Sequence, residues 1–92
     1  MTSIEIEFLT QLRASAGCDG MRLDSTEAMT VSTVIVQVIE AHPVLRALLV
    51  DEAGSRHGWL MIGVNDAMVA RGSDPPIAPG STVVLGTPVS GG

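Results

Sequence analysis

The segment Ile4–Phe8 alternates apolar and acidic side chains. This period of two predicts a β-strand whose three apolar residues share one face while the two glutamates point to the other. The segment Met21–Asp24 alternates in the same way and follows the glycine-bearing turn residues 17–20. We therefore expect the two segments to be antiparallel neighbours joined by a hairpin-like connection.

The stretch Thr30–Ala41 is rich in β-branched residues, which individually favour a strand. Its periodicity instead predicts a helix, because the apolar side chains recur at positions i, i+3, i+4, i+7 and i+8, from Val31 to Ile39. Thr30 is expected to cap the N-terminus of this helix. Pro43 cannot continue the helix but can begin another, so Pro43–Leu49 predicts a short second helix.

Further strands are predicted in the second half of the chain. Trp59–Val64 and Ala67–Val69 are apolar runs on either side of a turn at Asn65 and Asp66, and Thr82–Leu85 is the last predicted strand. Two strands, a helix and more strands predict the α+β class, with a mixed sheet packed on one main helix. We assign residues 1–86 to this domain. Residues 87–92 hold too much Gly and Pro to pack regularly and form a flexible C-terminal tail.

The amino-acid composition excludes several classes of function. The 92 residues suffice for one small domain. Ten acidic against five basic residues give a net charge of −5, the wrong sign for binding nucleic acid or an anionic membrane by charge. All five basic residues are arginine, which excludes mechanisms that need a phosphate-binding or Schiff-base lysine. The longest apolar stretch is shorter than the roughly 20 residues of a membrane-spanning helix.

Side chains suited to catalysis or metal binding are few. Cys18, His42 and His57 are too few and too scattered for a zinc site, which takes about four ligands. The G-x-S-x-G pattern of many serine hydrolases is absent. We therefore expect no metal and no bound cofactor. A single cysteine and the lack of an N-terminal targeting pattern predict a cytoplasmic protein.

The sequence ends at Gly91-Gly92, directly after Pro88-Val89-Ser90. Two residues without Cβ, following a stiff proline, form a thin segment that can enter a narrow channel and present its terminal carboxylate to ATP. The alternative interpretation is an ordinary frayed terminus.

With this ending, the chain resembles the ubiquitin-like sulfur carriers of the MoaD/ThiS family, and most closely the small subunit of molybdopterin synthase. The resemblance covers nearly the whole chain and implies the β-grasp fold. It is carried by the opening strand with residues 8–13, Thr30-Val31, Val64-Asn65 with Val69, Gly80 and the ending from Pro88 to Gly92.

The resemblance implies that the chain is not an enzyme on its own. In such carriers, an ATP-dependent partner related to ubiquitin-activating enzymes adenylates the C-terminal carboxylate, here that of Gly92 beside Gly91. A sulfide or persulfide donor then displaces AMP and leaves a thiocarboxylate. The large subunit of molybdopterin synthase, or another sulfur-accepting enzyme, receives the sulfur for the pterin precursor of the molybdenum cofactor.

We assign partner contacts to an apolar patch near the tail and to the tail itself. Because relatives of the molybdopterin branch often carry acidic residues around the glycine that corresponds to Gly80, where this chain has none, the partner stays open. Alternatives are a carrier for thiamine, cysteine or specialised-metabolite synthesis, a ubiquitin-like protein modifier, and an interaction module with an inert tail. The residues assigned to partner binding are Phe8, Leu9, Arg13, Trp59, Met61, Pro88, Val89 and Ser90.

Overall fold

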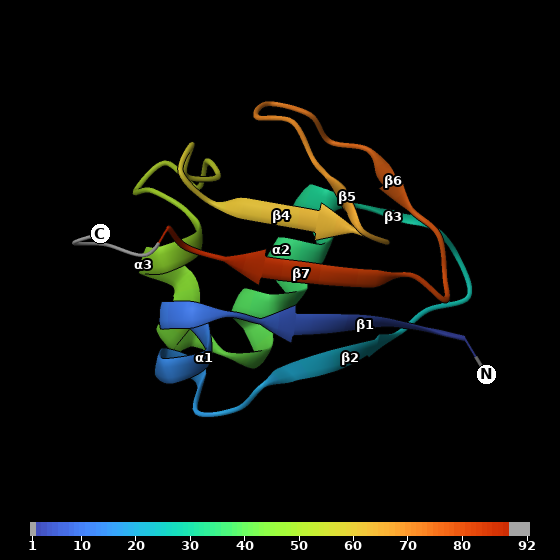
Figure 1. Ribbon diagram of the computed structural model, residues 1–92, viewed down its shortest axis with the longest axis horizontal. Helices are drawn as coiled ribbons and strands as arrows, with labels where there is room; N and C mark the ends of the chain where they lie inside the picture. Colours follow the sequence, from blue (N-terminus) through green and yellow to red (C-terminus); the bar gives the residue numbers. More distant parts are fainter. Residues whose placement is uncertain (1, 89–92) are drawn as a thin grey trace.

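The computed structural model describes residues 2–88 of the chain (Figure 1). Strands and short helices alternate along the first half, and strands follow in the second. In chain order the elements are β1 (Ser3–Phe8), α1 (Thr10–Ala16), β2 (Gly20–Asp24), β3 (Met29–Thr30), α2 (Val31–Ala41), the 3₁₀ helix η1 (Pro43–Leu45), α3 (Arg46–Leu49), β4 (Met61–Val64), β5 (Ala67–Met68), β6 (Pro76–Ile77) and β7 (Thr82–Gly86).

Five strands form the main sheet in the order β2-β1-β7-β4-β5. The central neighbours β1 and β7 are parallel, and the other pairs are antiparallel. The longest helix, α2, lies across one face of this sheet (Figure 1). The mixed sheet on one main helix and the antiparallel pairing of the first two strands confirm the prediction from the sequence.

The periodicity of α2 prevails over its β-branched composition, because four of the five predicted stripe positions are buried against the sheet. The side chain of Thr30 accepts a hydrogen bond from the backbone N–H of Thr33 at 3.2 Å, as expected of an N-cap. The helix predicted over Pro43–Leu49 is present as one turn of 3₁₀ helix followed by the short α3.

Three features differ from the prediction. The connection between β1 and β2 is not a simple hairpin, because it contains α1, a helix whose only buried residue is Leu12 and which ends at Gly17 with φ +75°. The small second sheet pairs β3 with β6 over two residues each, which is too short for any periodicity to reveal. Trp59 lies outside β4, which begins at Met61.

The core lies between the main sheet and the helices. β1 and β7 contribute their inward-facing alternate residues, α2 contributes its apolar stripe, and α1, η1 and α3 close one end. The side chains on the other face of the sheet point away from the helices. The buried apolar residues are Ile4, Ile6, Phe8, Leu12, Val31, Val34, Ile35, Val38, Leu45, Leu49, Val50, Ile62, Ile77, Val83 and Leu85.

Candidate functional site

The last strand carries the chain to the end of the sheet at which α1 begins (Figure 1). After Gly86, Thr87 is buried and Pro88 is exposed. We call residues 86–88 the tail base. The remaining site residues of the tail, Val89, Ser90, Gly91 and Gly92, lie outside the described residues, so the chemistry assigned to the terminal glycine stays a prediction.

Two of the predicted partner-binding residues flank Gly86. Met61 of β4 is its antiparallel partner. Leu9 follows β1, and its backbone N–H donates to the carbonyl oxygen of Leu85 at 2.9 Å. A Cβ added to Gly86 would come within 3.3 Å of the Cβ of Leu9, so the glycine allows this side chain to pack closely over the strand. The structure thus brings Leu9 and Met61 together at the tail base.

Apolar side chains continue from this point across the outer face of the sheet. Gly63 of β4 pairs with Val84 of β7 on one side and with Met68 of β5 on the other. Met61 and Met68 are 48% and 66% exposed, which is unusual for large apolar residues. We call Leu9, Met61, Val84 and Met68 the outer strip. The sequence analysis missed Val84 and Met68, because only the pairing of the strands shows that they share a face with Met61.

Phe8 is not part of this surface. Its side chain is fully buried, and its ring meets that of His42 edge to face with centroids 5.6 Å apart. The expectation that Phe8 contributes to an exposed patch is therefore wrong. The alternation in β1 explains the burial, because Phe8 lies on the same inward face as Ile4 and Ile6.

Trp59 precedes β4 and is 42% exposed. Its ring is stacked on that of His57, with centroids 4.4 Å apart and planes 15° from parallel. This stacking holds the indole in place while leaving much of its surface open to solvent. The exposed part of Trp59 is open to contact, and its assignment to partner binding stays a prediction.

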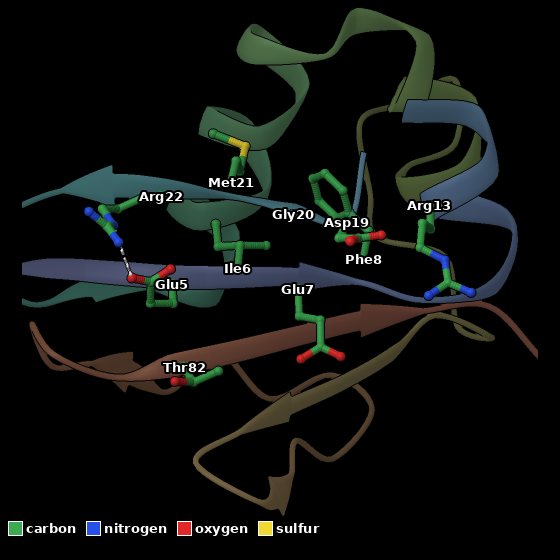
Figure 2. Close-up of a pocket in the computed structure, with 10 residues that line it drawn as sticks. All are labelled: Glu5, Ile6, Glu7, Phe8, Arg13, Asp19, Gly20, Met21, Arg22 and Thr82. Atoms are coloured by element: carbon green, nitrogen blue, oxygen red, sulfur yellow. Dashed lines mark hydrogen bonds and ion pairs between the residues drawn. The ribbon is translucent and has the colours of Figure 1, made fainter. Parts of the chain in front are cut away.

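Charged side chains border the outer strip on the side of β1 and β2. They line an open hollow of about 650 Å³. Figure 2 shows these side chains, with Arg13 of α1 among them. Arg22 and Glu5 form an ion pair at 2.8 Å, and Glu7 and Asp19 add negative charge. Arg13, the fifth of the predicted partner-binding residues that precede the tail, thus lies at the charged edge of the same face.

Residues 2–88 provide no other centre of chemistry. They contain no group of three His, Cys, Asp or Glu side chains that could hold a metal ion. Cys18 is half-buried, with its thiol 3.5 Å from the carbonyl oxygen of Gly20. Within the same residues, every helix is too short or too polar to cross a membrane. The tail base with the outer strip is therefore the best candidate site.

One polar contact at the tail base was not expected from the sequence. Thr10, the first residue of α1, is hydrogen-bonded through its side chain to Thr87. The two residues are 77 positions apart, so no local pattern connects them. A threonine directly after a strand carries no special signal of function.

The sequence matches the model of the ThiS family over residues 6–92. No curated protein gives a significant match. Among solved structures, the chain is similar to SAMP1 from Haloferax volcanii, with 28% identity and a TM-score of 0.85 over 98% of this chain and 99% of that one.

Two more distant structures share the same fold. One is a protein from Pyrococcus furiosus described as a putative molybdopterin converting factor, subunit 1, with 19% identity and a TM-score of 0.71 over 97% of this chain and 100% of that one. The other is Urm1 from Trypanosoma brucei, with 20% identity and a TM-score of 0.76 over 98% and 95% of the two chains. These similarities confirm the ubiquitin-like β-grasp fold.

Proposed function

Because the chain belongs to the ThiS family, we propose that it is a sulfur carrier whose C-terminal glycine, Gly92, is adenylated and then converted to a thiocarboxylate. The family match, which runs from Ile6 to Gly92 and so includes the terminal Gly91-Gly92, is the observation that carries this proposal. The chain supplies the reactive group and a docking surface, and its partners supply the catalytic residues and the ATP.

The proposed chemistry has two steps. A carboxylate oxygen of Gly92 attacks the α-phosphorus of ATP, and pyrophosphate leaves, which turns a poor electrophile into a mixed anhydride. A sulfide ion then attacks the carbonyl carbon and displaces AMP, leaving the thiocarboxylate. Neither step needs a catalytic side chain on the carrier, which agrees with the scarcity of such side chains around the tail base.

The outer strip supports a docking role. It places exposed methionine side chains next to the strand that leads into the tail, and methionine adapts its shape to an apolar partner surface. Charged residues at its edge, among them Glu7 and Arg13, can fix the orientation of a partner by charge complementarity. We propose that the adenylating enzyme binds Leu9, Met61 and Trp59 while the tail enters its active site.

For the acceptor, we propose a molybdopterin synthase large subunit, so that the sulfur is used for the pterin precursor of the molybdenum cofactor. Support comes from the sequence resemblance and from the shared fold of the Pyrococcus furiosus protein described as a molybdopterin converting factor. A carrier for thiamine, cysteine or another sulfur-containing metabolite would use the same chemistry at Gly92. Because adenylation consumes ATP, either pathway agrees with the expected cytoplasmic location.

The decisive experiment is intact mass spectrometry of the purified chain after incubation with ATP, sulfide and the adenylating enzyme of its own host. We expect a gain equal to the replacement of one oxygen by sulfur in the unmodified chain. Gly92→Ala should show no gain. Thr26→Val is the control, because Thr26 is an exposed residue between β2 and β3, outside the proposed docking surface. An unchanged mass with an active enzyme would refute the proposal.

A second candidate function is that of a ubiquitin-like protein modifier. It is favoured by the similarity to SAMP1 from Haloferax volcanii, because the protein of that name is described as a small archaeal modifier. The chain contains no lysine, so a modifier of this kind would form single attachments and no lysine-linked chains of itself. Diglycine remnants on cellular lysines that disappear when Gly92 is deleted would establish this function, and their absence would exclude it.

A further inference from the structure

Thr10 is exposed, and its side-chain hydroxyl is hydrogen-bonded to the tail base. Its Oγ1 lies 3.2 Å from the backbone nitrogen of Thr87, 3.0 Å from the Oγ1 of Thr87 and 3.1 Å from the Thr87 carbonyl oxygen. The carbonyl oxygen of Leu9 lies 2.8 Å away. We call this group of contacts the Thr10–Thr87 cluster.

One arrangement of protons uses every donor of the cluster. A hydroxyl oxygen has one hydrogen and two lone pairs. The N–H and the hydroxyl of Thr87 can both donate to the Oγ1 of Thr10, which in turn donates to one of the two carbonyl oxygens. Thr87, at 6% exposure, has no open access to water that could replace these bonds. The cluster therefore fixes both the backbone and the side chain of Thr87.

Thr10 adopts this position in an unfavourable backbone conformation. Its φ is +52°, a region that L-residues rarely occupy and that is least favourable for a β-branched side chain. Strain of this kind persists where surrounding contacts hold it, and it is concentrated at functional sites. Here the strained residue makes its side-chain contacts with the tail base.

We propose that Thr10 is a positioning residue, which fixes Thr87 and thereby directs the C-terminal tail toward the active site of the adenylating enzyme. This inference rests on the proposed function. Gly92 is the fifth residue after Thr87, and a segment of that length reaches at most about 18 Å. Over so short a reach, the direction in which Thr87 is held limits where the reacting carboxylate can lie, and Pro88 restricts the next backbone angle.

The step that Thr10 would accelerate is the first one. The Gly92 carboxylate forms a bond to the α-phosphorus of ATP, and the bond from that phosphorus to the bridging oxygen breaks to release pyrophosphate. No oxidant or reductant is needed. Misdirection of the tail would slow this step within the bound complex, whereas docking through the outer strip would persist. We therefore expect a loss in kcat with little change in the KM for the carrier.

A purely structural role for Thr10 predicts a different result, and Thr10→Gly separates the two. Glycine accepts a positive φ without strain, so the substitution relieves the backbone while it removes the hydroxyl. These effects on folding oppose each other, and the unfolding transition should move little. If Thr10 has only a structural role, the rate of adenylation should fall only in variants that lose stability. If Thr10 positions the tail, the rate should fall in a variant that is still well folded.

The test measures pyrophosphate release with the full-length chain, ATP and the adenylating enzyme of its own host. For Thr10→Val and Thr10→Gly we expect kcat to fall roughly five- to tenfold, the effect of losing one or two net hydrogen bonds. Thr10→Ser keeps the hydroxyl and should restore most of the rate. The matched control is Thr26→Val, at an exposed threonine between β2 and β3. Amide exchange at Thr87 should be faster in both hydroxyl-free variants and unchanged in the serine variant.

The outcomes separate this inference from the proposed function. Release of pyrophosphate by the unmodified chain with equal kcat in Thr10→Gly would overturn the role of Thr10 and leave the carrier function intact. An increase in KM alone would also overturn it, because the residue would then act in docking. If the unmodified chain released no pyrophosphate with an active enzyme, both the carrier function and the role of Thr10 would be refuted. Slower release in Thr10→Gly, rescued by serine, would support the role of Thr10.

Discussion

Truncation of Leu12 tests the helix that the sequence did not reveal. Leu12 is the one fully buried residue of α1, whereas Leu9, three positions earlier, is half-buried over Gly86. Replacing a fully buried leucine by alanine costs about 3–5 kcal/mol, because it removes apolar contacts and leaves a cavity. A domain of this size has a free energy of unfolding of roughly 5–14 kcal/mol. Leu12→Ala should therefore remove a large fraction of the stability.

The measurement is thermal unfolding of Leu12→Ala and Leu9→Ala, followed by far-ultraviolet circular dichroism. For Leu12→Ala we expect a Tm lower by roughly 12 °C or more, at about 4–8 °C per kcal/mol for a domain of this length. Leu9→Ala, which loses only a half-buried contact, should cost about 1 kcal/mol. Equal or reversed losses in the two variants would show that α1 does not pack as described.

Three further predictions concern single contacts. Thr30→Ala removes the cap of α2 and should cost about 1 kcal/mol in urea unfolding, and Thr30→Asp should restore most of it. Glu5→Gln breaks an ion pair with Arg22 whose side chains are 50% and 64% exposed, so its free energy of unfolding in urea should fall by less than about 0.5 kcal/mol; a larger loss would contradict the exposed geometry. Gly20→Ala should destabilise by roughly 1–3 kcal/mol, because its Cβ would overlap the carbonyl oxygen of Ile6 across the strand pair; thermal unfolding at or above the parent Tm would refute this contact.

The elements with a clear period could be predicted from the sequence, and the reason is physical. α2 and β1 each bury one face, so a periodic set of apolar positions marks both of them. α1 has no such mark, because its single buried residue is surrounded by small and polar ones. β3 and β6 are held by pairing over two residues each, and their length carries no period.

The candidate site could be predicted only in part. The terminal glycines and the exposed residues Met61 and Trp59 carry a signal in their own chemistry, independent of the fold. Phe8 was assigned to the surface although its alternation with Ile4 and Ile6 already placed it inward. An exposed patch can be identified from a sequence only after the buried face of each strand has been assigned.

The residues at the tail base come from both ends of the chain because β1 and β7 are parallel. Parallel neighbours end at the same edge of a sheet, so the junction of β1 with α1 meets the chain as it leaves β7. Antiparallel pairing would instead have placed the N-terminal residues beside Thr87. Both kinds of pairing produce the same period of two, so the sequence pattern cannot distinguish them. The make-up of the surface beside the tail base is therefore determined by topology, and Leu9 and Thr10 belong to it although nearly the whole chain separates them from Thr87.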